Sequence, residues 1–243
     1  MKAFYNSVLK ILLVILMLKK LNNFIHIIQN LYFKEKIFLK RKTYSMNQED
    51  VYINKFFENK KNGYFVDVGC FHPMRINNTY LLYKKGWRGI NIDISQFSID
   101  LFNYLRPKDV NILCGISDKN GNQKVYYQKE FSVLSTLKKK SAEAHFQGKI
   151  KTKTLKCLRL HEVIKNTKFK NRPIDFLNID IEGFDEIVLN SFEFDMYQPR
   201  LICAEDESPN KKFNETNLFK ILKPKGYKHL WSGIFSHLFY LDK

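Results

Sequence analysis

Cysteine is scarce in this chain and follows no pattern that would staple a fold or hold a metal. The four cysteines (Cys70, Cys114, Cys157 and Cys203) lie more than 40 residues apart, and none belongs to a CxxC pair. This excludes a disulfide-rich secreted scaffold and a zinc ribbon, which need closely spaced cysteines. Each cysteine lies in or beside an apolar run, so we expect buried thiols in a reducing compartment and a cytoplasmic location.

Arginine is also scarce, although the chain as a whole is strongly basic. The formal net charge is +17, yet 34 of the 41 basic residues are lysine and only 7 are arginine. Specific phosphate readers rely on the bidentate guanidinium group of arginine. The lysine excess, with 22 asparagines, therefore indicates A/T-rich coding, and nucleic acid is not favoured as a partner. Hydrophobic residues at 44% exclude a disordered or fibrous chain.

Acidic residues are absent from the first 34 positions, which sets this stretch apart. Residues 1–42 are predicted to be a basic, apolar, helical segment, in which residues 11–18 are eight consecutive apolar residues followed by two lysines. Eight residues are too few to span a bilayer, which takes about 20. Three interpretations are open: peripheral contact with the inner face of a membrane through residues 1–40, docking on the domain or a partner, and an uncleaved anchor over residues 4–18.

Short apolar runs alternate with helical patterns from residue 64 onward. The sequence predicts strands at residues 64–68, 89–93, 110–114, 124–127, 154–158, 174–179, 201–204, 227–231 and 235–241, and helices at 76–85, 96–105, 160–165, 185–191 and 214–222. Residues 129–152 are polar, and we expect a mobile loop or lid there. The alternation predicts one α/β domain over residues 43–243 with a mostly parallel sheet, whose ligands bind beyond the carboxyl ends of the strands.

The glycine-rich motifs of nucleotide binding are missing. After Gly69 the chain has no second or third glycine of a GxGxxG motif, and it contains no GxxxxGK[ST] sequence. These absences argue against a nicotinamide dinucleotide and against a nucleoside triphosphate. Several strands nevertheless end in an acid, namely Asp67, Asp93, Asp180 with Glu182, and Glu205.

One acid at a strand end is ordinary helix capping, but acids at four strand ends would gather in the ligand crevice. Asp93 follows Gly69 by 24 residues, which suits an acceptor for ribose hydroxyl groups. A ribose-binding acid without a pyrophosphate loop favours S-adenosylmethionine, because a cationic sulfonium tolerates an acidic crevice. The spacing therefore points to that cofactor.

Six sequence blocks point to a known family. They are residues 45–50 (SMNQED), 65–69 (FVDVG), 77–80 (NNTY), 86–93 (GWRGINID), 115–118 (GISD) and 174–185 (IDFLNIDIEGFD), of which the last is the most specific. This set resembles the FkbM-type methyltransferases. The resemblance implies a Rossmann-like class I methyltransferase fold, a mostly parallel seven-stranded sheet with helices on both faces, and methylation of hydroxyl groups, often on sugars of glycans. The turn after Gly69 departs from the family's pattern at His72 and Pro73.

The resemblance also implies roles for individual residues. Asp67 and Gly69 would line the methionine end of the cofactor, and Asp93 would hold the ribose. Ser117 and Asp118 would flank the adenine.

Methyl transfer to a hydroxyl group needs a base that removes its proton. The candidates are Asp180, which would lie near the transferring methyl group, together with Glu182, His72 and, less favoured, His161. Asp180, Glu182 and Glu205 could instead bind Mg²⁺ or Mn²⁺, because hard cations prefer clustered oxygens.

The leading functional hypothesis is an S-adenosylmethionine-dependent O-methyltransferase that acts on a carbohydrate-containing acceptor. An RNA methyltransferase is a second hypothesis, suggested by the charge and by the lysines at positions 138–140. A third is a protein that keeps the cofactor fold without catalysis and docks onto a glycan-synthesis machinery. Binding of S-adenosylmethionine separates the third hypothesis from the other two.

Overall fold

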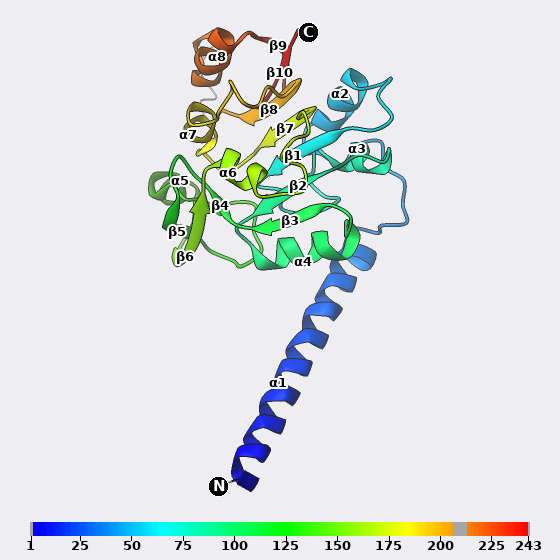
Figure 1. Cartoon of the computed structure of the whole chain (residues 1–243), viewed down its shortest axis with the longest axis vertical. Helices are drawn as coiled ribbons and strands as arrows, with labels where there is room; N and C mark the ends of the chain where they lie inside the picture. Colours follow the sequence, from blue (N-terminus) through cyan, green and yellow to red (C-terminus); the bar gives the residue numbers. More distant parts are fainter. Residues whose placement is uncertain (1, 207–212, 243) are drawn as a thin grey trace. The chain divides into compact units, whose positions relative to one another are not determined.

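The computed structural model describes residues 2–206 and 213–242, and the chain divides into two units, Met1–Arg41 and Lys42–Lys243. The first unit is one helix, α1 (Lys2–Ile28), which continues as a π-helical stretch, η1 (Gln29–Lys34) (Figure 1). After it, Arg41 forms an ion pair with Glu35 at 3.4 Å and donates a hydrogen bond to the Glu35 carbonyl. The predicted helical segment is therefore a helix over most of its length.

The second unit is built on a seven-stranded sheet. Its order is β3 (Val110–Leu113), β2 (Arg88–Asp93), β1 (Tyr64–Val68), β7 (Phe176–Ile179), β8 (Leu201–Glu205), β10 (Ser236–Leu241) and β9 (Tyr227–Ser232) (Figure 1). The first five strands pair in parallel, and β10 runs antiparallel to both β8 and β9. Because the chain reverses its strand order at β1, a crevice forms at the carboxyl ends there.

Helices cover both faces of this sheet, because β1 and its neighbours are apolar on both sides. On one face, alternate residues such as Val66 and Ile90 pack with α6 (Leu160–Lys165), α7 (Asp185–Asn190) and α8 (Asn217–Leu222). On the other face, Phe65 and Phe176 pack with α2 (Glu49–Phe56) and α3 (Tyr80–Lys84). α4 (Gln96–Leu105) contacts β2 and β3. Buried strands of this kind read as continuous hydrophobic runs, which made them predictable from sequence.

A smaller sheet extends from the main one, in the order β4 (Gly115–Ile116), β6 (Lys151–Leu158) and β5 (Gly121–Tyr127). The stretch between β5 and β6, which we predict to be irregular, contains α5 (Lys139–His145) and a β-bridge between Tyr126 and Thr136. The helix buries Ala142 and pairs Lys139 with Glu143 at 3.2 Å across one turn. The helix has seven residues and buries only Ser141 and Ala142, too few positions to show a helical repeat in the sequence.

Candidate active site

A pocket of about 370 Å³ opens at the carboxyl ends of the central strands. Gly69 follows β1, Asp93 ends β2, Asp180 follows β7 and Glu205 ends β8, and all four line this pocket. The rest of the wall is mostly apolar, with Ile92, Ile94, Cys114, Ile116, Leu134, Leu137, Ile181 and Phe184. The volume lies within the range of small-molecule sites. The structure therefore brings Asp93, Asp180, Glu182 and Glu205 to one pocket, whereas Asp67, the remaining strand-end acid, does not line it.

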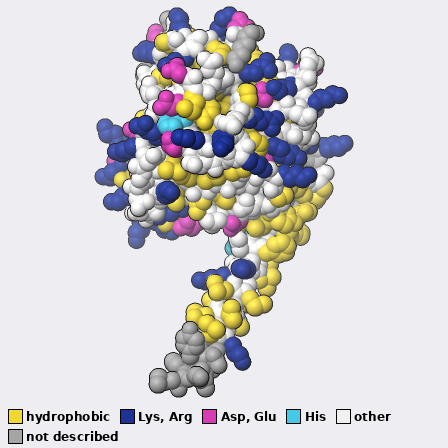
Figure 2. All heavy atoms as spheres, viewed as in Figure 1, with side chains coloured by type: hydrophobic (Ala, Val, Ile, Leu, Met, Phe, Trp, Pro, Cys, Tyr) yellow, Lys and Arg dark blue, Asp and Glu magenta, His cyan; other side chains and the backbone are white. Residues whose placement is uncertain are grey.

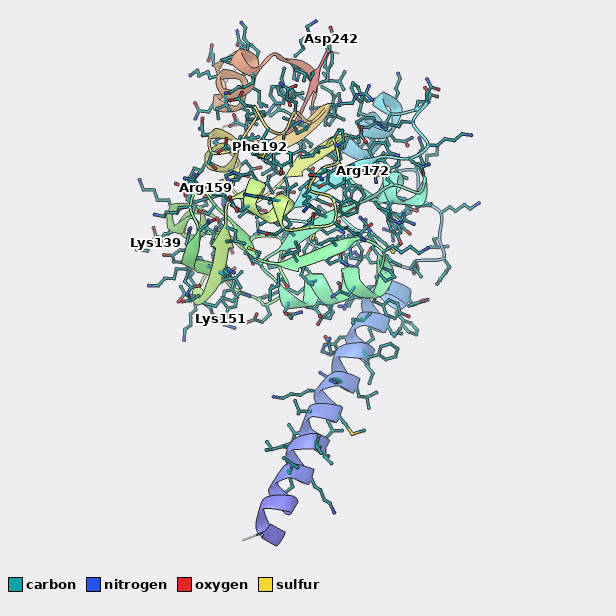
Figure 3. The ribbon with its side chains drawn as sticks, in the orientation of Figure 1. Lys139, Lys151, Arg159, Arg172, Phe192 and Asp242 are labelled. Carbon is teal, nitrogen blue, oxygen red and sulfur yellow. The ribbon has the colours of Figure 1, made fainter. Side chains whose placement is uncertain are left out.

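The segment of residues 132–137 forms one wall of this pocket. Thr136 donates a hydrogen bond from its hydroxyl group to the Glu182 carbonyl at 2.9 Å, and Lys138 donates one from Nζ to the Gly183 carbonyl at 3.1 Å. The segment is thus tied to the turn after β7. Lys139 and Lys151, which flank this region on α5 and β6, lie at the outer edge of the domain (Figure 3).

Asp93 is held in a fixed orientation at the end of β2. Its Oδ2 accepts a hydrogen bond from the backbone N–H of Phe71, and its Oδ1 accepts one from the backbone N–H of Ser95, both at 2.8 Å. Burial raises the pKa of Asp93 to about 6, against the opposing effect of these hydrogen bonds. Each carboxylate oxygen has a second lone pair. Asp93 can therefore still accept hydrogen bonds from a ligand in the pocket.

Asp67 lies outside this pocket, in a buried polar network. Its Oδ2 accepts hydrogen bonds from Thr79 Oγ1 at 2.8 Å and Asn77 Nδ2 at 3.3 Å, and its Oδ1 accepts one from Asn178 Nδ2 at 2.9 Å. The fully buried Arg106 donates hydrogen bonds to Thr79 Oγ1 and to Asn77 Oδ1. Burial raises the pKa of Asp67, while the charge of Arg106 and the three hydrogen bonds lower it. Asp67 thus organises the network that supports the turn after β1.

Gly69 is required by the packing of backbone against backbone. It has φ of +77°, and a Cβ atom there would overlap the carbonyl oxygen of Asp180. The absence of a side chain therefore lets the end of β1 approach the end of β7. Gly69 also lines the pocket, and its place at the methionine end of the cofactor stays a prediction from the family resemblance.

Asp180 and Glu205 form a coupled pair of carboxyl groups at the pocket wall. Burial raises the pKa of Asp180 well above its usual range, and the charges of Glu205, Glu182, Asp67 and Glu49 raise it further. Burial also raises the pKa of Glu205 to about 8, although a hydrogen bond with Asp180 lowers it in part. Carboxylates this close cannot all ionise. The pair therefore retains a proton at neutral pH.

Asp185 holds these two acids together through the backbone. Its Oδ2 accepts a hydrogen bond from the N–H of Ile181 at 3.3 Å, and its Oδ1 accepts one from the N–H of Glu205 at 3.2 Å. The N-cap residue of α7 is Phe184, without a side-chain cap. Asp180 is therefore not the cap of this helix, which removes the ordinary structural reason for an acid at its position.

A second, polar pocket of about 20 Å³ adjoins the large one. The two pockets share Met46, Gly69, Ile76, Asp180 and Glu205, and the small one is also lined by Glu49, Asp67, Asn78, Asn178 and Ser236. A volume of this size holds about one water-sized group. The carboxyl pair thus stands at the boundary between a ligand-sized pocket and a site for a single polar group.

Among the polar residues of the small pocket, Glu49, Asn78 and Asn178 were not predicted as site residues. Glu49 is buried in the first turn of α2, and Asn78 donates from Nδ2 to Asn178 Oδ1 at 2.9 Å. The only signal for Glu49 and Asn78 was their place in two of the family-like blocks, 45–50 and 77–80. Nothing in the local pattern indicated that α2 and the turn before α3 face the end of β7.

The structure places four sequence candidates outside both pockets, namely His72, Ser117, Asp118 and His161. His72 is buried, and its Nδ1 accepts hydrogen bonds from the backbone N–H groups of Met74 and Arg75 at 3.1 and 3.0 Å, so it braces the turn after β1. Ser117 donates its hydroxyl hydrogen bond to Asp118 at 2.9 Å, and neither residue lines a pocket.

Cys114 and Ile116 line the wall where adenine was expected beside Ser117 and Asp118. The reason is that successive side chains at the end of a strand point in opposite directions, so Ile116 faces the pocket and Ser117 faces away from it. His161, on α6, likewise lines neither pocket.

Backbone strain gathers at the pocket. Phe71, Ile76 and Glu182 have φ values of +48°, +48° and +52°, and all three line it. A positive φ is uncommon for residues other than glycine and is an outlier for β-branched Ile76. Such strain persists only where the surroundings impose it, and it is concentrated at functional sites.

The structure shows no metal site in residues 2–206 and 213–242. No group of three or more histidine, cysteine or acidic side chains there is arranged to hold an ion. The carboxyl groups of Asp180, Glu182 and Glu205 therefore make an acidic pocket wall rather than a visible metal centre.

Residues 67–229 match the Methyltransferase FkbM domain family. Because the match covers more than half of the chain, the protein belongs to this family, and its fold is the predicted Rossmann-like class I methyltransferase fold with seven strands. Family membership makes it an S-adenosylmethionine-dependent methyltransferase.

Among solved structures, a TehB-like SAM-dependent methyltransferase from Corynebacterium glutamicum is similar at 11% sequence identity with a TM-score of 0.42. The similarity covers 82% of this chain and 89% of that one. A likeness at that level carries no argument about the site. None of the curated proteins matches the chain.

Proposed function

We propose that this protein is an O-methyltransferase that acts on a hydroxyl group of a sugar in a glycan-containing acceptor. The residues of the large pocket fit S-adenosylmethionine. The pocket has a small-molecule volume, a largely apolar wall suited to adenine, and Asp93 with lone pairs available for ribose hydroxyl groups. Its acids suit the cationic end of that cofactor. When bound, the cofactor supplies a methyl group activated by a positively charged sulfur atom.

The observation that carries the proposal is the position of Asp180 and Glu205 at the boundary of the two pockets. An alcohol oxygen must lose its proton as it is methylated, and a carboxylate with a raised pKa is a better acceptor than an ordinary one at neutral pH. Once the pair has lost its shared proton, the Asp180 carboxylate accepts the proton of the alcohol. Asn78 and Asn178 offer amide groups beside this position for further hydrogen bonds.

The acceptor class is supported by the family resemblance, in which hydroxyl groups of sugars are common acceptors. The lysine run gives RNA no comparable support, because Lys138 binds the Gly183 carbonyl and Lys139 pairs with Glu143. Metal participation remains a separate prediction, which activity in the presence of a chelator tests.

The test uses S-adenosylmethionine with a deuterated methyl group and polysaccharide from cells that lack the gene. We expect mass spectrometry to find one deuterated methyl group on sugar residues, and a 14-dalton difference between polysaccharides from cells with and without the gene. Total RNA is incubated in parallel. Labelled RNA with unlabelled polysaccharide would replace this proposal by RNA methylation. Failure to bind the cofactor at millimolar concentration would favour a non-catalytic docking protein.

A further inference from the structure

The apolar half of α1 has no polar side. Residues 11–18 are eight consecutive Ile, Leu, Val and Met residues, and each side chain is between 43% and 70% exposed. Successive side chains on an α-helix point about 100° apart. Eight of them therefore cover every direction, and Figure 2 shows apolar side chains along this helix with few lysines between them.

The following half of the helix is different. From residue 19 onward, the polar side chains Lys19, Asn22, Asn23 and His26 recur at a helical spacing, and Leu21, Ile25 and Ile28 recur on another side. This half has the two-sided pattern of a helix at a membrane surface. α1 thus changes from uniformly apolar to amphipathic at Lys19 and Lys20.

Length agrees with entry into a bilayer. Residues 11–18 extend over roughly 12 Å at 1.5 Å per residue, which reaches part of the way into a hydrocarbon core of about 30 Å. Residues Leu9–Lys34 have a mean hydropathy of 1.8 in their most apolar window. The stretch of residues 11–18 is therefore too short to cross the whole hydrocarbon core, and the flanking lysines can extend their ammonium groups toward the interface.

We propose that α1 anchors the protein in a lipid bilayer end-on. Residues 11–18 lie in the hydrocarbon, and Lys19 and Lys20 lie among the headgroups on the side of the methyltransferase domain. A flat orientation would leave half of the apolar side chains of residues 11–18 in water. A coiled coil with a second copy needs a narrow stripe of apolar residues every 3.5 positions rather than a full circle.

The charge distribution selects the leaflet. Basic residues at positions 19, 20, 34, 36, 40, 41 and 42 follow the apolar stretch, against lysines at positions 2 and 10 before it, and residues 1–34 contain no acid. Excess lysine marks the cytoplasmic side of a membrane segment, and anionic lipids attract it there. The domain is therefore held at the cytoplasmic leaflet.

The test places one aspartate at a time on each side of the helix in the full-length protein. Leu13→Asp, Val14→Asp, Ile15→Asp and Leu16→Asp cover four directions, and Asn22→Asp is the control that adds the same charge to the amphipathic half. Sedimentation with vesicles of phosphatidylcholine and phosphatidylglycerol at 3:1 gives the partition coefficient.

We expect each of the four substitutions to lower the partition coefficient roughly 100-fold, because an acid is costly at the centre of a membrane helix, whereas Asn22→Asp changes it less than about threefold. Binding should survive 1 M salt and weaken, without vanishing, on phosphatidylcholine alone. Loss at only one or two of the four positions would show a one-sided contact and overturn the proposal. Complete release of the protein from the vesicles by 1 M salt would also overturn the proposal. The same holds if the full-length protein binds its cofactor but does not sediment with vesicles.

Discussion

Two acids at neighbouring strand ends meet opposite environments. Asp67 lies on β1 opposite Asn178 of β7. Asp180 follows Asn178 by two residues, so it lies on the same side of the sheet as Asn178. Three side chains donate hydrogen bonds to Asp67, and the charge of Arg106 lowers its pKa. Burial raises the pKa of Asp180 most, and the largest charge effects on it, from Glu205, Glu182, Asp67 and Glu49, raise it further.

In the proposed function, this difference separates a structural acid, Asp67, from the acid that removes the proton, Asp180. Both occur in the sequence as an aspartate near the end of an apolar strand, and the sequence analysis assigned Asp67 to the methionine end of the cofactor and Asp180 to the base or a metal ligand near the transferring methyl group. The fold compensates the charge of Asp67 and leaves that of Asp180 facing the pocket. Perturbed carboxyl groups in a cleft are where acid–base chemistry is concentrated.

The largest expected effect is the loss of turnover on substitution of Asp180. Asp180→Asn keeps the shape of the side chain and removes its charge, so turnover should fall roughly 10²–10⁴-fold, the contribution of a positioned base. Cofactor affinity should change little, because Asp93 and the apolar wall are unaltered. Steady-state kinetics and calorimetric titration measure the two quantities. Turnover within about threefold of the native value would remove Asp180 from the mechanism, since it is not a helix cap either.

Substitution of Asp67 should lower the stability of the fold. Asp67→Asn removes one of the two acids whose charges favour protonated Arg106, and it leaves the buried Asn77 and Asn178 amides without a charged acceptor, so we expect the free energy of unfolding to fall by about 2 kcal/mol. Asp195→Asn, at an exposed turn, is the control and should stay within about 0.5 kcal/mol. Urea titration followed by circular dichroism compares them. Equal stability of the two variants would contradict the assigned role of Asp67.

Asp93 tests the cofactor side of the pocket. Asp93→Ala removes an acceptor of ribose hydrogen bonds, and the dissociation constant of S-adenosylmethionine should rise about 10–150-fold. Titration calorimetry on protein with a native circular dichroism spectrum measures it. Unchanged affinity would show that another group holds the ribose.

The smallest expected effect concerns Glu49, which raises the pKa values of both Asp180 and Glu205. Glu49→Gln removes one neighbouring negative charge, so the pH midpoint of activity should move down by less than about one unit. A pH–rate series on this variant, beside the native protein, detects the shift. An upward shift would show that Glu49 acts in another way.

The sheet was largely predictable because its strands are buried on both faces and therefore appear as continuous apolar runs. The strand at residues 64–68 and the acids Asp93, Asp180 and Glu205 follow directly from that pattern. The helix predicted over residues 76–85 begins later, at Tyr80, because Asn77 and Thr79 use their side chains in the Asp67 network.

The rest of the site depends on contacts that sequence distance conceals. Glu49 reaches the end of β7 only through the packing of α2, more than 100 residues away in sequence. The sequence places His72 shortly after Gly69, but it does not predict where the ring points. In the structure the ring accepts hydrogen bonds from the backbone N–H groups of Met74 and Arg75 and does not line the pocket. Side chains alternate in direction along residues 114–117, so Cys114 and Ile116 line the pocket and Ser117, one position later, does not.

The pH dependence of kcat/KM tests the reactive carboxyl pair most directly, because this quantity reports ionisations of the free enzyme. Loss of a proton from the pair creates the base, so kcat/KM should rise with pH and level off above the apparent pKa of the pair, near the value of about 8 for Glu205. Glu205→Gln removes a charge that raises the pKa of Asp180, so the midpoint should fall. A profile that is already level from pH 6 upward, or a midpoint that stays in place in Glu205→Gln, would contradict the account.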